Sequence, residues 1–376
     1  MNVLAIVSTI EFQNRATIEA ISKRYGNINV VVKRNIKDYF KVKVRSEFVN
    51  ISYFYTFFPE RIRRKYHILE FMEMMISFFF LYGKIRGNDV FLLTNTHVAY
   101  IVPLLKLKKK KIVSLFVDPY SLMNDFLTKK EETTLATRSD MLLCTSKNLA
   151  AIYCRKHLGV NVVGKYWPNT VDLSLWNINK FSSIINSGAI VFGYAGNMNE
   201  ITIDIDLVEM LVKEFSDFNF KFAGAINFKD EKKSKRMNDI FRSNNVEYIG
   251  MVPYDLIQNE VYSWDVCLML DNINELSSYV HHNKIYQYLS LGKIVVATKT
   301  HDDYINLSSE VYEAKTKDEF IEKCRDAILV ARDKDRIINR VRLAKAESSD
   351  ARAEEFMKLV HLNLSPNYLE LQVDRS

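Results

Sequence analysis

The sequence has few cysteines, and they do not form a metal-binding pattern. The four are scattered along the chain and no two stand in a C-x-x-C pair, at Cys144, Cys154, Cys267 and Cys324. Short zinc motifs need paired cysteines, so this spacing argues against a zinc site. We expect four reduced thiols, as is typical of a protein in the cytosol.

Long apolar runs are also missing. The most apolar stretch is residues 71–82 (FMEMMISFFFLY), which is shorter than the ~20 residues that a membrane-spanning helix needs. The first residues, MNVLAIVSTIEFQNR, have no basic segment and only a short apolar run, unlike a signal peptide. We therefore expect a cytoplasmic protein that does not cross a membrane on its own.

The common phosphate-binding loops and metal motifs do not occur. A predicted strand at residues 3–8 runs into Ser8-Thr9-Ile10-Glu11, without the G-x-G-x-x-G of dinucleotide-binding proteins, and there is no Walker A motif. This argues against a dehydrogenase. No Asp-x-Asp motif has a convincing strand-loop setting, and Asp302-Asp303 reads as a solvated pair. We expect neither a metal nor another cofactor.

Strand-like and helix-like segments alternate twice along the chain. In the first half, strands are predicted at residues 3–8, 28–32, 89–93, 111–117 and 141–144, with helices at 14–25, 71–85, 97–105, 129–138 and 147–157. In the second half, strands are predicted at residues 190–194, 218–223, 246–249, 266–270 and 294–297, with helices at 205–215, 233–243, 254–261 and 283–291. A helical tail starts at residue 317. This alternation predicts an α/β fold with parallel sheets covered by helices on both faces.

A break in the alternation marks a domain boundary. Residues 167–176 (WPNTVDLSLW) contain Pro and Asn and fit a linker. Open parallel sheets bind ligands at the carboxyl ends of their strands, so two such sheets facing each other would form a deep cleft. We expect the chemistry of the protein to lie there.

Four segments of the second half follow one another in a familiar order. They are residues 192–197 (FGYAGN), 246–256 (VEYIGMVPYDL), 264–270 (WDVCLML) and 283–298 (NKIYQYLSLGKIVVAT). This half resembles the nucleotide-binding half of GT-B glycosyltransferases of bacterial polysaccharide and lipopolysaccharide assembly. Residues 116–120 (FVDPY), 139–146 (SDMLLCTS) and 167–173 (WPNTVDL) are similar, more loosely, to landmarks of the first half of that family.

The resemblance implies two Rossmann-like domains that face each other across a cleft. We predict an acceptor-binding domain over residues 1–170, a nucleotide-sugar-binding domain over residues 171–340, and a helical tail over residues 341–376 that packs back on the first domain. The sequence departs from the family at Gln287, where relatives carry a glutamate. Retaining relatives have a second glutamate eight positions earlier, where this chain has Tyr279. An inverting mechanism therefore gains weight.

The resemblance also implies a donor site. The Gly196-Asn197 turn and Lys284 are each expected at the start of a helix, where they would hold the donor diphosphate without a metal. His282 and Asn283 border this region, and Gln287 lies one helical turn after Lys284, where its amide would bond to ribose hydroxyls. The base is expected at the turn that follows the strand at residues 246–249, formed by Val252, Pro253 and Tyr254. The alternative interpretations are a tight turn at Gly196, a surface lysine, and a packing role for Tyr254.

An inverting transferase also needs a base on the acceptor side. Asp118 ends a predicted strand of the first half and is the first candidate, although it also fits an Asp-Pro turn. Glu11, after the first strand, is the competing candidate, with Arg15 beside it on the acceptor side. Glu131 and Glu132 fit charges near the start of a helix.

Basic residues cluster in the first half of a chain with net charge +7, in residues 61–65 (RIRRK) and 106–111 (KLKKKK). The first cluster ends residues 53–67 (YFYTFFPERIRRKYH), in which five aromatic residues precede the basic ones. Aromatic and basic side chains favour anionic membrane surfaces, so we predict peripheral attachment to the inner face of the cell membrane. The alternative is that the aromatics belong to the core and the basic residues merely solvate the surface. No nucleic-acid-binding motif accompanies the clusters, and we expect no nucleic-acid partner.

The sequence therefore predicts a metal-independent glycosyltransferase, favouring hexosyl transfer. A UDP-sugar is the preferred donor, and the acceptor is a lipid-linked sugar or an oligosaccharide in cell-surface polysaccharide synthesis. Two alternatives remain open. One is a nucleotide-sugar epimerase of the same fold, which would need further acid-base carboxylates. The other is a catalytically inactive glycosyltransferase-like subunit that has lost its glutamates.

Overall fold

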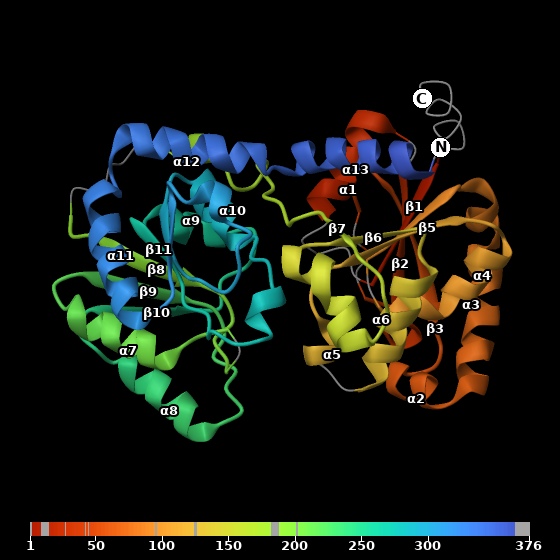
Figure 1. Cartoon of the computed structure of the whole chain (residues 1–376), viewed down its shortest axis with the longest axis horizontal. Coiled ribbons are helices and arrows are strands. Elements are labelled where there is room, and N and C mark those ends of the chain that lie inside the picture. The colour runs from red at the N-terminus through yellow and green to blue at the C-terminus, as the bar shows by residue number, and fades with distance from the viewer. Residues whose placement is uncertain are drawn as a thin grey trace. The chain divides into compact units, whose positions relative to one another are not determined.

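The computed structural model describes residues 2–8, 15–26, 28–41, 43, 45–94, 96–123, 126–181, 188–200 and 202–364. The chain divides into two compact units, coloured along the sequence in Figure 1. Unit 1 holds the chain up to Thr170, the short segment Tyr279–His281 and the chain from Ser349 on. Unit 2 holds Val171–Ser278 and His282–Ser348. The chain thus passes between units within the predicted linker and again at Ser348–Ser349.

Unit 1 is built on a parallel sheet of seven strands in the order β3-β2-β1-β4-β5-β6-β7. The strands are β1 (Val3–Val7), β2 (Ile28–Asn35), β3 (Asn50–Thr56), β4 (Val90–Leu93), β5 (Lys111–Phe116), β6 (Met141–Cys144) and β7 (Lys165–Tyr166). Its helices are α1 (Arg15–Tyr25), α2 (Glu60–Lys65), α3 (His67–Gly87), α4 (Val102–Leu107), α5 (Tyr120–Met123), α6 (Phe126–Arg138), α13 (Ser349–Leu364) and the π-helix η3 (Leu149–Leu158). Two 3-10 turns, η1 (Ile36–Asp38) and η2 (Thr96–Ile101), complete the unit.

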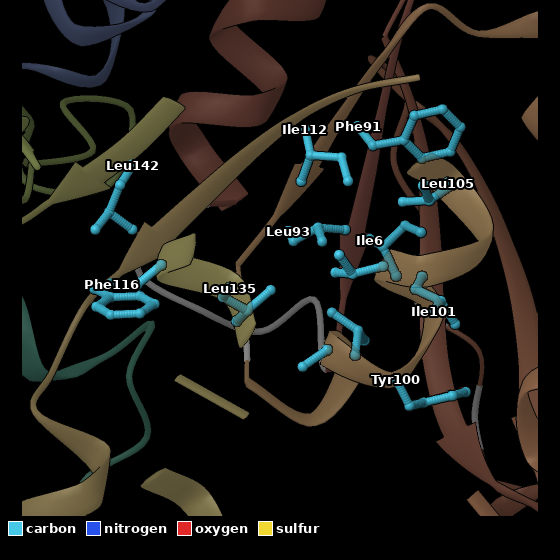
Figure 2. Packing of buried hydrophobic residues seen from close by; sticks show 14 of the residues in the cluster. Ile6, Phe91, Leu93, Tyr100, Ile101, Leu105, Ile112, Phe116, Leu135 and Leu142 are labelled. Carbon is cyan, nitrogen blue, oxygen red and sulfur yellow. The ribbon is translucent and has the colours of Figure 1, made fainter. Parts of the chain in front are cut away.

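Alternate residues of each strand enter two separate cores, because side chains along a strand point to opposite faces. In β1, Leu4 and Ile6 belong to one core, whereas Ala5 belongs to the other. Figure 2 shows the first core, in which Ile6, Phe91 and Leu93 pack with residues of η2 and α4. The second core is closed by α1 and by α13, which brings Phe356 and Val360 onto the sheet.

Unit 2 repeats the plan with a parallel sheet of six strands in the order β10-β9-β8-β11-β12-β13. The strands are β8 (Val191–Ala195), β9 (Asn219–Ala223), β10 (Val246–Gly250), β11 (Val266–Met269), β12 (Ile294–Thr298) and β13 (Val311–Ala314). The helices are α7 (Ile205–Glu214), α8 (Glu231–Ile240), α9 (Ile257–Tyr262), α10 (Lys284–Ser290), α11 (Lys317–Val330) and α12 (Lys334–Ala346), with the 3-10 turns η4 (Ile178–Lys180) and η6 (Ile305–Leu307). A further turn, η5 (Ser277–Tyr279), leads into the segment assigned to unit 1.

Four helices of unit 2 begin at side-chain caps that the sequence provides. Asp204 accepts a hydrogen bond from a backbone N–H of α7, Asp230 caps α8, Thr316 caps α11 and Asp333 caps α12. Each cap satisfies a backbone donor that the first helical turn leaves without a partner. These local signals explain why the helices start where they do.

The α/β prediction with two parallel sheets is confirmed, but β3, α2 and β13 were not predicted from the sequence. Residues 53–67 were expected to face a membrane. Instead, Phe54 and Tyr55 lie in β3 and are only 1% and 8% exposed. Arg63 is buried at 1% exposure, where it and Arg64 bond to Glu131. Part of this segment is therefore core and internal ion pairs, whereas Phe57, Ile62 and Tyr66 stay 43%, 46% and 49% exposed.

Helix α3 is much longer than α2 and contains the most apolar stretch of the chain. None of the helices in the described ranges combines the length and apolar character needed to cross a bilayer.

Candidate functional site

Three neighbouring strands of unit 2 end in glycines that pack on one another. β8, β9 and β10 lead into Gly196, Gly224 and Gly250, respectively. The Gly196 N–H donates to the Ala223 carbonyl at 2.9 Å, and the Gly224 N–H donates to the Gly250 carbonyl at 2.7 Å. A side chain at Gly224 would overlap the Gly196 carbonyl, so the close approach of these strand ends requires glycine there. The sequence singled out only Gly196 of these three.

The side chain of Lys284 reaches this same glycine edge from the first residue of α10. Its ammonium lies 5.1 Å from the centre of the Tyr194 ring, the residue two positions before Gly196. A Cβ atom added to Gly196 would overlap the Lys284 Nζ. Lys284 and Gly196, two predicted donor-site residues that lie far apart in the sequence, are thus in direct contact.

Lys284 is not in direct contact with a carboxylate in the described part of unit 2. It forms no ion pair with any described carboxylate, and its pKa is lowered because the protein encloses it. Asp271, which follows β11, opposes this shift through its charge. The described contacts therefore leave the ammonium without a carboxylate bound to it, and an enclosed cation of this kind favours an anionic ligand.

Asp271 is itself engaged by another residue of the predicted donor site. The His282 Nε2 lies 3.2 Å from an Asp271 oxygen. Burial alone would raise the pKa of Asp271, but the charges of His282, Lys284 and His301 lower it overall. The His282 backbone N–H also donates to the Tyr304 hydroxyl at 2.7 Å, which fixes the start of α10. Asp271 was not identified from the sequence, because only the ends of separate strands bring it to this cluster.

Of the two adjacent histidines, His282 lies in this cluster, whereas His281 belongs to unit 1. The Asn169 side-chain amide donates to the His281 carbonyl at 2.6 Å, and the Ser146 hydroxyl donates to the Tyr279 carbonyl at 2.8 Å. The segment Tyr279–His281 is therefore anchored in unit 1. Asn283 follows as the half-buried residue before α10, and its side chain does not cap that helix.

The residues predicted to bind the nucleoside form a second group, which is joined by a hydrogen bond. Gln287, only 5% exposed, donates from its amide to the Tyr254 hydroxyl at 3.2 Å. Tyr254 follows Val252 and Pro253, and the Pro253 carbonyl accepts the N–H groups of Leu256 and Ile257. Helix α9 begins only at Ile257, so Tyr254 lies in the turn and not in a helical first turn. The structure thus brings Tyr254 and Gln287 together, with Val252 and Pro253 beside them in the chain.

Two expectations about this region are wrong. The Gly196-Asn197 turn does not open a helix, because α7 begins at Ile205 after its Asp204 cap. The exposed Asn197 instead uses its carbonyl, which accepts the Thr202 hydroxyl at 2.6 Å. Asp303 is not solvated, since its side chain is 1% exposed and lies 3.7 Å from that of His301. Within the ranges that the structure describes, no three His, Cys, Asp or Glu side chains group as a metal site would require.

In unit 1, Asp118 follows β5 at the carboxyl edge of the sheet and is half-buried. Its carbonyl accepts the Tyr120 N–H at 3.0 Å, as in a turn. The pKa of the Tyr120 hydroxyl is raised by burial and by the charges of Asp118 and Glu132. Asp118 therefore occupies the predicted position, in a region with a second acidic side chain.

That second acid, Glu132, was interpreted from the sequence as a charge near the start of a helix, but it is fully buried. It accepts the Tyr153 hydroxyl at 2.7 Å and the Ser121 N–H at 3.2 Å. Burial raises the pKa of Glu132, and these donors offset the shift only in part. Its neighbour Glu131 is bonded to Arg63 and Arg64. Neither glutamate is a solvated helix-end charge, because α6 packs this part of its length into the unit.

The other acceptor-side candidates are less informative. Arg15 is the first residue of α1, and its guanidinium binds Glu19 at 2.9 Å while 38% of the side chain stays exposed. Glu11 lies outside the described residues.

No protein-family model matches the sequence, and no curated protein sequence does either. Solved structures nevertheless match along nearly the whole chain. HepE from Anabaena, in complex with UDP, has a TM-score of 0.69 at 11% identity, covering 96% of this chain and 99% of its own. Sucrose-phosphate synthase from Thermosynechococcus elongatus has a TM-score of 0.69 at 11% identity, covering 96% and 98% of the two chains. Trehalose-6-phosphate synthase OtsA has a TM-score of 0.71 at 9% identity, covering 95% and 98%.

At these identities the likeness shows the fold. The chain shares the α/β architecture of these proteins, with two parallel sheets, and the predicted GT-B fold class is confirmed.

Proposed function

We propose that this protein is a glycosyltransferase that transfers a sugar from a nucleoside diphosphate donor, with a UDP-sugar preferred. The observation that carries the proposal is the Lys284 ammonium, which lies against the backbone of Gly196 and forms no direct ion pair with a described carboxylate. Support comes from the structural neighbours, since HepE was solved with UDP and a further neighbour from E. coli was solved with UDP-2-fluoro glucose. Donor binding is assigned to residues 171–340.

In this proposal the donor diphosphate lies beside Lys284, with His282, Asn283 and Asn197 next to it. As the bond between sugar C1 and the diphosphate oxygen breaks, negative charge develops on that oxygen. The Lys284 ammonium stabilises this charge, so the step needs no metal. Gln287 bonds to the ribose, and the Val252-Pro253-Tyr254 turn meets the base. Because Gln287 already donates to Tyr254, the two side chains are oriented before the nucleoside binds.

The acceptor side is assigned to residues 1–170, with the tail at 341–376 supporting it. The acceptor hydroxyl oxygen forms the new bond to C1 and gives its proton to the Asp118 carboxylate, while the nucleoside diphosphate leaves with the electrons of the broken bond. Positions 279 and 287 carry no glutamate, which supports inversion at C1. Arg15 and Glu11 stay candidates for acceptor binding. We further propose that the transferred sugar is a hexose and that the acceptor is a lipid-linked sugar or an oligosaccharide. The reaction would belong to cell-surface polysaccharide synthesis, and the protein would be cytoplasmic and peripheral to the membrane.

A donor panel tests this function. Thermal unfolding of the full chain is measured with UDP, GDP and ADP, and then with UDP-sugars, because a ligand of the native state raises the apparent stability. We expect the largest shift with UDP compounds. If none of the three nucleotides shifts the unfolding transition, nucleotide-sugar binding is contradicted.

Turnover then separates the candidate classes. A transferase releases UDP only when an acceptor sugar is present, and we expect this result. Conversion of the donor sugar without an acceptor would identify an epimerase. Donor binding with neither reaction, across a panel of lipid-linked and free glycans, would identify an inactive subunit.

A further inference from the structure

The outer face of helix α3 is more apolar than its buried stripe, which includes a glutamate and a serine. Side chains at four-residue spacing lie buried against unit 1, at Glu73, Ser77, Leu81 and Ile85. Residues on the opposite side of the helix are large, apolar and exposed, with exposed fractions of 70% for Ile68, 45% for Met72, 76% for Phe79 and 50% for Tyr82. A surface helix of a water-soluble protein normally presents polar residues on this side. The outer face of α3 therefore lacks the polar residues that water would favour.

The exposed apolar surface extends beyond this stripe. Phe71 and Phe80 of α3 are 58% and 53% exposed, and Leu107 at the end of α4 is 76% exposed. Contacts tie α4 to α3, because the Lys108 ammonium lies 5.6 Å from the centre of the Phe78 ring. Phe78 in turn packs edge-on against Tyr82 at 5.3 Å. Contiguous apolar surface of this kind marks a binding surface. We call it the α3 face.

Basic residues surround the α3 face. The segment Lys106 to Lys111 begins in α4, and Lys84 and Arg86 lie in the last turn of α3. The two acids of α3 are both compensated. Glu70 pairs with Lys130 at 3.2 Å, and buried Glu73 accepts the backbone N–H groups of Phe57 and Phe58. Lys106 and Lys111 share one further acid, Asp140, at 2.7 and 3.7 Å. Basic residues still outnumber acids, so the net charge around this apolar surface is positive.

The positive charge continues into a hollow at the amino-terminal end of α3. This cavity of about 470 Å³ is lined by residues of α2, α3, α4 and α6. Its cations are Arg64, Lys106, Lys130 and Arg138, set against Glu70 and Glu131. Arg64, Lys130 and Lys106 pair with Glu131, Glu70 and Asp140, so the hollow adds only a small net positive charge. An apolar face bordered by more basic than acidic side chains is complementary to a surface that combines acyl chains with anionic headgroups.

We propose that the α3 face binds an anionic lipid bilayer, with α3 lying in the plane of the interface and the Lys106 to Lys111 segment against the headgroups. Charge favours lipid over a second copy of this chain, because two such faces would bring two rims of the same sign together. The proposal deepens the peripheral membrane location in the proposed function by naming the surface that binds, and bilayer binding stands or fails independently of donor binding. It takes the place of residues 53–67, in which Phe54, Tyr55 and Arg63 are buried, as the proposed membrane surface.

Vesicle co-sedimentation of the full chain tests the proposal. The probes are vesicles of phosphatidylcholine alone and of phosphatidylcholine with phosphatidylglycerol, at low and high salt. We expect binding to the anionic vesicles that weakens as salt rises. Ile68→Ser with Phe79→Ser should lower the vesicle-bound fraction about tenfold, since both side chains enter the interface. Lys108→Glu with Lys110→Glu should lower it similarly and remove most of its salt dependence.

A matched control replaces exposed apolar residues in another part of the chain. Leu329→Ser with Ile338→Ser changes two side chains of unit 2 that are 81% and 66% exposed, and vesicle binding should stay at the wild-type level. The thermal shift with UDP, measured on every variant, shows that the fold and donor binding are intact and separates this test from that of the proposed function. No binding to anionic vesicles at low salt, or equal binding to neutral vesicles, would overturn the proposal. So would a wild-type dimer that the α3 variants convert to a monomer without any change in vesicle binding.

Discussion

Each unit contains a lysine whose pKa is lowered by burial, and the two lysines have different partners. In unit 1, Lys33 is 4% exposed and is bonded to Glu60, whose other oxygen lies 2.9 Å from His97. In unit 2, Lys284 has no bound carboxylate among the described residues, and its Nζ lies against Gly196. Burial lowers the pKa of both lysines. We infer from this difference that Lys33 serves the fold, and we propose that Lys284 serves a ligand.

The largest effect should come from Lys284→Ala. Loss of this cation removes charge stabilisation of the leaving diphosphate. We expect the transition state to lose ~2–4 kcal/mol of stabilisation, the scale of one oxyanion donor, and turnover to fall accordingly. The free energy of unfolding should change little, because relief of the burial of Lys284 is offset by the loss of its attraction to buried Asp271. The measurement is steady-state kinetics together with urea unfolding. Turnover within threefold of the wild type would contradict the role of Lys284.

Asp118→Asn extends the comparison to the carboxyl edge of the sheet in unit 1. If transfer inverts C1, this substitution should lower turnover by ~100-fold, the scale of general-base catalysis, and leave donor binding unchanged. NMR of the product gives the anomeric configuration independently. A matched control is Asp38→Asn, at an acid that pairs with Lys41 on the surface of unit 1. Retention of configuration would show that no such base is needed.

Lys33→Met should show the opposite pattern to Lys284→Ala. The buried ion pair with Glu60 is broken, but Glu60 is 32% exposed and keeps its contact with His97. We therefore expect a loss of about 1–2 kcal/mol in the free energy of unfolding, below the cost of breaking a fully buried pair. Turnover per folded molecule should be unchanged. A large loss of turnover in correctly folded protein would erase the distinction between the two lysines.

The smallest expected effect is a pH dependence of UDP affinity. The ordinary pKa of lysine is 10.5 and that of Lys284 is lowered by burial, so the free protein loses this charge at a lower pH than usual. UDP affinity should decline as pH rises through this lowered pKa, and binding should take up a proton in that range. Lys284→Arg keeps its charge throughout, so the difference between the two proteins isolates the lysine from titration of uracil. Identical pH profiles for both would contradict the assignment.

Local sequence signals predicted most of the fold, because strands buried in parallel sheets appear as short apolar runs. β1 and β12 are such runs, and both were found. β3 (NISYFYT) was missed because its aromatic and polar residues resemble a surface segment when neighbouring strands are unknown. β13 was missed because its four residues include a glutamate at a half-buried position.

The candidate site was predictable only where a motif marks it. Gly196, Lys284 and Gln287 belong to segments with a family resemblance, and the structure joins Lys284 to Gly196. Asp271 and Gly224 come from other strand ends, so only the register of the sheet brings them to the site. The outer face of α3 could not be recognised from the sequence, because the buried stripe includes Glu73 and Ser77 while large apolar residues are exposed, the reverse of the usual pattern.

Isothermal titration of UDP and of uridine is the most direct test of the central claim, that Lys284 binds the donor diphosphate. Both ligands are titrated into the wild type, Lys284→Ala and Lys33→Met. We predict that UDP binds far more tightly than uridine to the wild type and to Lys33→Met, and that this difference largely disappears in Lys284→Ala while uridine affinity is unchanged. A folded Lys284→Ala protein that keeps the wild-type preference for UDP over uridine would contradict the account.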